Sequence, residues 1–206
     1  MHDYPAANPK NPTLVLAHGA GAGEQHPWMV RLAKGLSARG IHVVTFNFVY
    51  MDAKRSAPDR PDVLEKTYRD AWTTLTSGRT GPLFAGGKSM GGRIASQVAA
   101  KGGFDPAPAG LVFFGYPLHP PGKPEQRRDK HLPDIRQPML FFHGARDPFG
   151  SPDEMTSLVA RLSRSTLHIV PGGDHSLTTR KKAGPGGDAL DQVMDQAAEW
   201  MQRVLY

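Results

Sequence analysis

Short runs of apolar residues alternate with longer amphipathic stretches along most of this chain. Six runs are mostly apolar, which is typical of strands buried on both faces; they cover residues 13–17, 42–46, 83–85, 111–114, 139–142 and 166–170. Between and after them, the pattern predicts helices at about 27–39, 61–76, 90–101, 152–163 and 188–204. This alternation indicates an α/β fold, with a mostly parallel sheet of about six strands and helices on both faces.

A single domain covering residues 1–206 is expected, because neither an internal repeat nor a linker interrupts the pattern. Hydrophobic residues make up 39% of the chain, and it has no cysteine, which excludes disulfide bonds and thiolate metal sites. The first twelve residues are polar and rich in proline, unlike a signal peptide. No apolar run reaches the length of a membrane span. These features predict a cytoplasmic location.

The net charge of +6 bears on possible partners. Two clusters of basic residues stand out, Lys123, Arg127, Arg128 and Lys130 in the first and Arg180, Lys181 and Lys182 in the second. The simplest interpretation is solvated loop charge. Attraction of anionic substrates is the alternative, because both clusters follow strand ends on the same predicted face. Neither cluster has the interleaved aromatic residues or the motif of a nucleic-acid site, so no nucleic-acid partner is expected.

The most informative motif is Gly-x-Ser-x-Gly around Ser89. An apolar strand precedes it and helix-forming residues follow, so the serine is predicted at the apex of a sharp strand-to-helix turn. Side chains at Gly87 and Gly91 would collide with the helix and the neighbouring strand, which explains the two glycines. A phosphate-binding loop is the rival interpretation, but its first glycine would fall at Pro82.

Two later loops carry partners for a nucleophilic serine. Asp147 follows the strand predicted at 139–142, and His175 follows the strand predicted at 166–170. The order serine, acid, histidine, with the last two on loops after late strands, predicts a triad of Ser89, Asp147 and His175. Asp174 and Asp153 are weaker candidates for the acid, because one is adjacent to the histidine and the other begins a predicted helix.

An early loop of small residues predicts a site for a developing oxyanion. The strand at 13–17 runs into His18-Gly19-Ala20-Gly21. In such loops a backbone N–H group binds the oxyanion together with the N–H of the residue after the nucleophile. Here the two donors would be Ala20 and Met90.

Taken together, these motifs resemble the small, lidless, dienelactone-hydrolase-like branch of the α/β-hydrolases. Within that branch, the chain is most similar to a bacterial group that resembles the hydrolase-like domain of a eukaryotic chromatin-complex subunit and a testis-expressed protein. Residues 18–21, 87–93, 115–120, 143–147 and 174–176 carry the resemblance. It implies an α/β-hydrolase fold without a cap domain and the same serine, aspartate and histidine. The nucleophile differs from the cysteine of dienelactone hydrolase, so that enzyme's reaction is not implied.

The remaining polar residues near these motifs receive structural interpretations. Structural hydrogen bonds are expected for His18 and His143, and His168 lies within a strand. Lys88 and Arg93 are expected to be exposed or paired in local salt bridges. The proline-rich loop at 115–137, which includes His119, is too short for a folded cap and is expected to shape an open pocket.

Two functions remain possible on these residues. The first is a serine hydrolase, acting through an acyl-enzyme on small-molecule esters, with thioesters and amides also open, and needing no metal or organic cofactor. The second is a non-catalytic binding module on the same fold. No membrane partner is expected, and the sequence does not identify the substrate or the oligomeric state.

Overall fold

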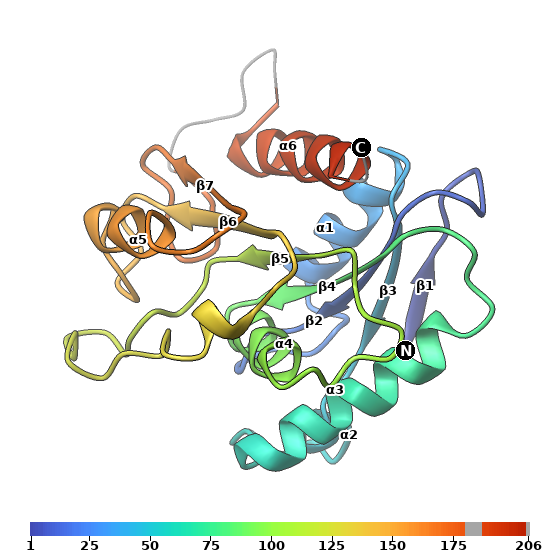
Figure 1. Cartoon of the computed structure of the whole chain (residues 1–206), viewed down its shortest axis with the longest axis horizontal. Helices are drawn as coiled ribbons and strands as arrows, with labels where there is room; N and C mark the ends of the chain where they lie inside the picture. The colour runs from blue at the N-terminus through green and yellow to red at the C-terminus, as the bar shows by residue number, and fades with distance from the viewer. Residues whose placement is uncertain (180–186, 205–206) are drawn as a thin grey trace.

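A seven-stranded sheet forms the centre of the molecule in the computed structural model, which describes residues 1–179 and 187–204 (Figure 1). The strands are β1 (His2–Tyr4), β2 (Thr13–Ala17), β3 (His42–Phe46), β4 (Leu83–Lys88), β5 (Gly110–Phe114), β6 (Met139–Gly144) and β7 (Ser165–Val170). Their order in the sheet is β1-β3-β2-β4-β5-β6-β7, and only β1 runs antiparallel to its neighbour. The sheet is therefore mostly parallel, as expected, and has one strand more than the six that the apolar pattern predicted.

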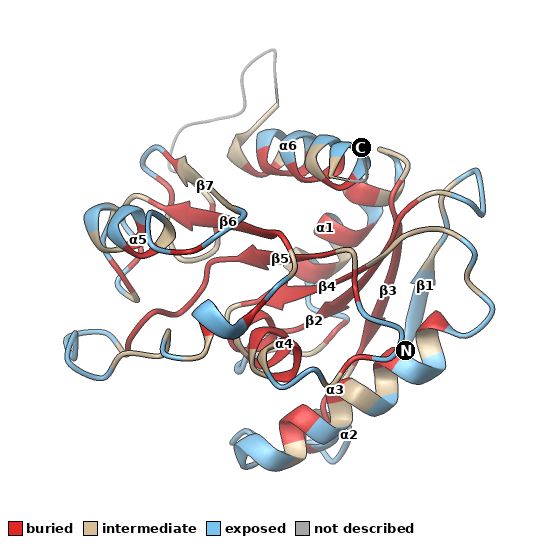
Figure 2. Ribbon diagram, viewed as in Figure 1, coloured by how far each residue is buried: buried red, intermediate tan, exposed pale blue. Residues whose placement is uncertain are grey.

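The helices cover both faces of this sheet (Figure 1). They are α1 (Pro27–Ser37), α2 (Val49–Asp52), α3 (Pro61–Thr76), α4 (Met90–Ala100), α5 (Pro152–Val159) and α6 (Ala189–Arg203), with a short 3-10 helix η1 (Leu132–Asp134). Helices α1 and α6 pack on one face, and α3, α4 and α5 pack on the other. Successive residues of one strand point to opposite layers: Leu14 and Leu16 join the α1/α6 core, whereas Val15 and Ala17 join the other. Figure 2 shows this burial as continuous along the inner strands.

Local sequence signals account for where several helices begin. The Ser151 hydroxyl accepts a hydrogen bond from the Glu154 backbone N–H, and the Ser151 backbone N–H donates one to the Glu154 carboxylate. Together these two bonds form a capping box before α5. Asp188 and Asp191 form the same motif before α6. Asp188 also binds Arg31 of α1 through two hydrogen bonds of 2.7 Å, so the start of α6 is tied to its neighbour.

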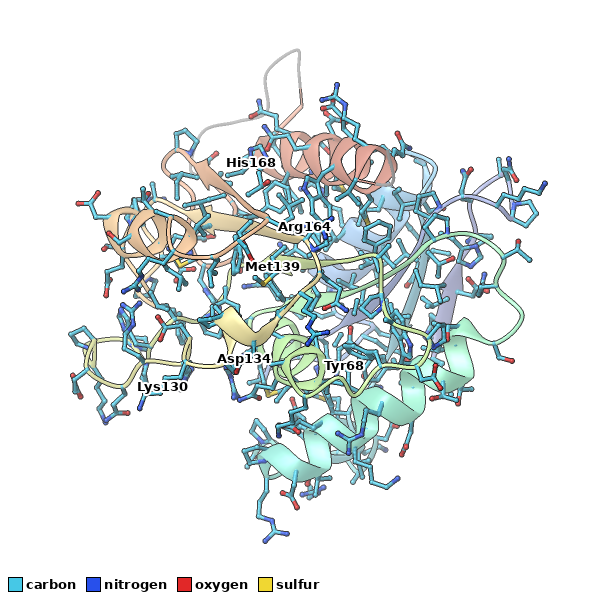
Figure 3. The ribbon with its side chains drawn as sticks, in the orientation of Figure 1. Tyr68, Lys130, Asp134, Met139, Arg164 and His168 are labelled. Carbon is cyan, nitrogen blue, oxygen red and sulfur yellow. The ribbon has the colours of Figure 1, made fainter. Side chains whose placement is uncertain are left out.

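One buried tyrosine connects a helix to the two central strands. Tyr68 of α3 (Figure 3) places its hydroxyl 2.8 Å from the carbonyl oxygens of both Val15 and Gly86, and it accepts a hydrogen bond from the Gly86 backbone N–H at 2.9 Å. The hydroxyl has one proton, so it donates to one of these carbonyls at a time. This contact anchors β4 shortly before it reaches Ser89.

Strand β1 and helix α2 were not predicted by the apolar pattern. Strand β1 has three mostly polar residues, and Asp3 within it accepts hydrogen bonds from Arg79 and pairs with His42. Helix α2 is a single turn of four residues. Elements this short bury too little apolar surface to leave a periodic signal. In the part of the chain that the structure describes, no helix has the length and apolar character needed to cross a membrane.

Candidate active site

The strand-to-helix turn at Ser89 has a strained backbone. Ser89 lies at φ 50° and ψ −116°, a conformation that residues with side chains rarely adopt. A methyl group on Gly87 would lie 2.6 Å from the backbone of α4, and one on Gly91 would lie 2.5 Å from the Ala17 carbonyl oxygen. Helix α4 can therefore approach β2 and β4 closely only because both flanking residues are glycines. The turn holds the Ser89 hydroxyl at the carboxyl edge of the sheet.

The structure brings the three predicted triad side chains into one chain of hydrogen bonds. The Ser89 hydroxyl lies 2.8 Å from Nε2 of His175. Nδ1 of the same ring lies 2.7 Å from Oδ2 of Asp147. Since the carboxylate accepts from Nδ1–H, Nε2 is left to accept the serine proton. The geometry is that of a serine positioned next to a general base.

The Asp147 carboxylate is buried and held from several sides. It is 5% exposed, and its Oδ1 accepts a hydrogen bond from the Phe149 backbone N–H at 2.9 Å. The Phe149 ring packs against the His175 ring, with 4.2 Å between their centroids. On the other side, Nδ1 of the fully buried His143 lies 3.7 Å from Asp147 Oδ2. These contacts restrict the Asp147 carboxylate and the His175 ring to one relative orientation.

Asp174 shapes the histidine loop instead of pairing with the histidine. Its carboxylate accepts hydrogen bonds from the backbone N–H groups of Ser176 and Thr178 and from the Thr178 hydroxyl. Burial alone would raise the pKa of Asp174, but these bonds outweigh it and hold the pKa below its ordinary value. The loop that presents His175 is thus fixed by a turn of its own.

The loop after β2 lies beside the serine, as its sequence suggests. A methyl group on Gly19 would lie 3.6 Å from Cβ of Ser89, so the backbone of this loop is near the hydroxyl. Among the described residues, no acceptor is bonded to the backbone N–H of Ala20 or of Met90. Both groups are therefore free to bind an oxygen atom of a ligand.

A pocket of about 290 Å³ opens beside these groups. Its lining is mainly apolar and comes from the segment after β2, the start of α1 and the two triad loops; the residues are Gly19, Ala20, Gly21, Ala22, His26, Trp28, Met29, Lys88, Ser89, Phe149, His175 and Ser176. A larger hollow of about 740 Å³ lies at the far end of α4 and contains no triad residue. The pocket at Ser89 is also at the point where the strand order reverses, between β2 and β4, which is the usual ligand crevice of open α/β sheets.

The proline-rich loop at 115–137 does not line this pocket, so the expectation that it shapes the pocket was wrong. The loop instead folds onto α4 and its own backbone. Tyr116 and Leu118 are buried, and the Tyr116 hydroxyl donates to the Arg128 carbonyl at 2.7 Å. The tip, residues 121–126, is exposed throughout. Buried anchors at both ends draw the loop away from Ser89, and apolar residues from the start of the chain take its place.

The histidines outside the triad make structural contacts. His18 accepts a hydrogen bond from the Phe48 backbone N–H at 3.0 Å, so its Nδ1 donates to the Gly19 carbonyl. Burial lowers the pKa of His18 and keeps the ring neutral. His168 of β7 (Figure 3) stacks on the ring of Phe142. His119 is buried, bonds the Pro120 carbonyl and the Glu154 carboxylate, and is not among the residues that line the pocket.

Lys88 and Arg93 differ from the expectation of exposure or a local salt bridge. Lys88 is only 8% exposed, and its Nζ donates to the His175 carbonyl oxygen at 2.5 Å. Arg93 is half-buried and bonds Gln97 at 3.3 Å. Neither side chain forms a salt bridge within residues 1–179 and 187–204. Lys88 is buried because it belongs to β4, where its side chain points into the layer of α1 and α6 and not toward solvent. The sequence held one signal, a lysine directly before the nucleophile.

The first basic cluster is partly neutralised by acidic neighbours. Arg127 pairs with Asp129 at 2.5 Å and with Glu154 at 3.4 Å. Lys130, in the same cluster, lies on the outer part of the loop (Figure 3). The second cluster, Arg180, Lys181 and Lys182, lies outside the described residues. No group of three or more side chains suited to a metal ion converges within the part of the chain that the structure describes.

Comparison with known proteins points to one family. The model of a family described as an alpha/beta hydrolase domain matches residues 10–204. Est1E from Butyrivibrio proteoclasticus, solved with ferulic acid bound, superposes with a TM-score of 0.75 at 12% identity, over 97% of this chain and 91% of that one. Dienelactone hydrolase from Anabaena variabilis gives 0.73 at 21% identity, over 96% and 88%. A serine hydrolase without a lid from Xanthomonas campestris gives 0.67 at 19% identity, over 98% and 83%. At such identities these structures share the fold with this chain.

Proposed function

Because this chain belongs to the alpha/beta hydrolase domain family, we propose that it is a serine hydrolase that cleaves carboxylic esters with small acyl groups. The observation that carries the proposal is the continuous pair of hydrogen bonds from Asp147 through His175 to Ser89. The free amides of Ala20 and Met90 and the adjoining apolar pocket support it.

In the first step, Oγ of Ser89 attacks the carbonyl carbon of the ester while Nε2 of His175 takes the hydroxyl proton. Asp147 keeps the imidazole in the tautomer with Nδ1 protonated and stabilises the imidazolium that forms. The carbonyl oxygen becomes an oxyanion and binds the Ala20 and Met90 N–H groups. One such donor contributes about 3 kcal/mol of transition-state stabilisation in serine hydrolases.

The tetrahedral intermediate then collapses to an acyl-enzyme. The proton on Nε2 of His175 passes to the leaving alkoxide, which departs as an alcohol. Water next attacks the Ser89 ester, again giving its proton to His175, and the second collapse releases the carboxylic acid and the free serine. These steps are complete with the triad, the two amides and one water molecule.

The pocket sets the scale of the substrate. A volume of about 290 Å³ lies at the lower end of the range for small-molecule sites. Its walls include the apolar side chains of Trp28, Met29 and Phe149, which suit an alkyl or aromatic acyl group. Est1E was solved with ferulic acid bound, so a feruloyl ester belongs in any panel alongside short alkyl esters.

The test combines a covalent probe with a substrate series. A fluorophosphonate probe and p-nitrophenyl esters of increasing acyl length are applied to the wild type, Ser89→Ala and Ser157→Ala. Ser157 is an exposed serine of α5 and provides the matched control. We expect labelling and turnover in the wild type and in Ser157→Ala. Ser89→Ala should lose labelling and lower kcat by roughly 10⁴-fold or more.

The same experiment separates this function from a non-catalytic binding module. A folded wild type that is neither labelled by the probe nor active on any ester would contradict the proposal. Activity that survives unchanged in Ser89→Ala would assign the turnover to a contaminating enzyme.

Esters with short acyl groups are expected to give the highest kcat/KM because of the pocket volume.

A further inference from the structure

The side chain of Lys88 lies under the loop that carries His175. Lys88 ends β4, directly before Ser89, and it is 8% exposed. Its ammonium group donates a hydrogen bond of 2.5 Å to the His175 carbonyl oxygen and forms no ion pair with any carboxylate of the described residues. A buried cation without an anionic partner is costly. This one contact joins Lys88 to the backbone of His175, whose imidazole bonds the Ser89 hydroxyl.

Trp28 of α1 holds the same loop from the adjacent position. Its ring lies beneath the ammonium group of Lys88, with 5.7 Å from Nζ to the ring centroid, a distance at which a cation–π contact contributes. Its indole N–H donates to the Ser176 carbonyl at 2.9 Å. Two side chains from different elements thus bind the two consecutive carbonyls of His175 and Ser176.

The backbone at Gly115 provides room for this contact. Gly115 has a φ of +70°, a conformation that favours glycine. A methyl group there would lie 2.7 Å from the His175 carbonyl oxygen and 3.0 Å from Nζ of Lys88. The end of β5 is therefore shaped so that the ammonium group and the carbonyl can meet.

We propose that Lys88 is a positioning residue that holds His175 at bonding distance from Ser89. The inference rests on the proposed serine-hydrolase function. Lys88 is the last residue of β4 and Ser89 follows it directly in the turn, so a bond from Lys88 to the histidine loop fixes the base relative to the nucleophile through a single short path. A displacement of about 1 Å between such groups costs roughly a hundredfold in rate.

The charged groups around Lys88 come from the two triad loops. Asp147 and Asp174 favour its ammonium form, and the imidazole rings of His143 and His175 also lie close to the site. Helix α1 contributes the uncharged Trp28. Burial outweighs the two carboxylates and lowers the pKa of Lys88 to about 8. The ammonium form that binds the carbonyl most strongly therefore predominates at neutral pH and declines above pH 8.

The test compares Lys88→Met, which removes the donor, with Lys88→Gln, which keeps a donor that does not titrate. Lys34→Met removes an exposed lysine of α1 and is the control. Values of kcat and KM for p-nitrophenyl acetate are measured from pH 6 to 10, together with the rate of fluorophosphonate labelling. Lys88→Met is expected to lower kcat and the labelling rate roughly tenfold to a hundredfold, with a smaller change in KM.

Three further results are expected if Lys88 positions the base. The wild-type rate should fall above about pH 8, and this fall should be absent in both Lys88 variants, with part of the lost rate restored in Lys88→Gln. The proton on Nδ1 of His175, observed by NMR, should shift or broaden in Lys88→Met. A folded Lys88→Met with wild-type kcat, alkaline limb and Nδ1 resonance would overturn the inference. A wild type that the probe does not label would instead reject the serine-hydrolase proposal, and the NMR comparison would still test Lys88.

Discussion

Replacing Lys88 with methionine should make the protein more stable while it makes the histidine loop less well placed. The two side chains have similar length, but methionine brings no charge into the layer between α1 and the sheet. Burial is the main cause that lowers the pKa of Lys88, from 10.5 to about 8. A depressed lysine pKa means that the folded protein binds this proton less tightly than the unfolded chain does, so the charge destabilises the fold.

The magnitude follows from the two pKa values. A difference of about 2.5 between 10.5 and about 8 corresponds to roughly 3 kcal/mol at about 1.4 kcal/mol each. The methionine variant forfeits the hydrogen bond to His175, which contributes about 1 kcal/mol. The net gain in the free energy of unfolding at pH 7 is then about 2 kcal/mol. For a domain of this size, that gain corresponds to a rise in Tm of roughly 4–8 °C.

The stability difference between Lys88→Met and the wild type should also depend on pH. The penalty is fully present below pH 8, where Lys88 is charged in both states, and it disappears between about pH 8 and 10.5 as the folded protein releases the proton first. Urea unfolding of the wild type, Lys88→Met and Lys34→Met at pH 7 and pH 9.5 measures it. The difference in free energy of unfolding between Lys88→Met and the wild type should be smaller at pH 9.5 than at pH 7. A variant that is less stable than the wild type at pH 7, or whose advantage does not narrow, would refute the reasoning.

Three other substitutions test the frame around the site. Gly91→Ala places a methyl group 2.5 Å from a carbonyl oxygen of β2 and should lower Tm strongly, whereas Gly21→Ala, with no atom within 4 Å, should leave it unchanged. Tyr68→Phe removes the hydroxyl that accepts from the Gly86 N–H and should cost about 1–3 kcal/mol in urea unfolding; an unchanged midpoint would contradict this. Phe149→Ala removes a pocket wall and should shift the kcat/KM optimum toward longer acyl esters, and an unaltered chain-length profile would place the acyl group elsewhere.

The apolar pattern predicted the inner strands because parallel strands buried on both faces are apolar at most positions. The structure confirms the strands at Thr13–Ala17 and His42–Phe46 with their predicted bounds. It extends the strand at 83–85 to Leu83–Lys88, since glycines and a lysine give no apolar signal even where they are buried. The parallel topology then follows from the helices between the strands, and it brings the ends of β4, β6 and β7 to one edge.

The site could be predicted to the extent that it depends on strand ends. Ser89, Asp147 and His175 each follow a recognisable strand, so their convergence follows from the topology. The pocket walls could not be predicted in this way, because Trp28 reaches the site from a helix and its neighbours in sequence look like any amphipathic segment. The burial of Lys88 could not be predicted either. Burying a lysine is costly, and its partner here, the His175 carbonyl, is identified only in the folded structure.

The exposed tip at 121–126 belongs to a loop that is anchored at both ends and does not line the pocket, so it should tolerate inserted residues. Insertions at such a tip leave the scaffold intact, since loop length adds little entropic cost. A segment grafted there would extend the outer surface of the protein without altering the groups that line the pocket. The exposed tip is in this way the part of the loop that can change in length and composition while Ser89, Asp147 and His175 keep their positions.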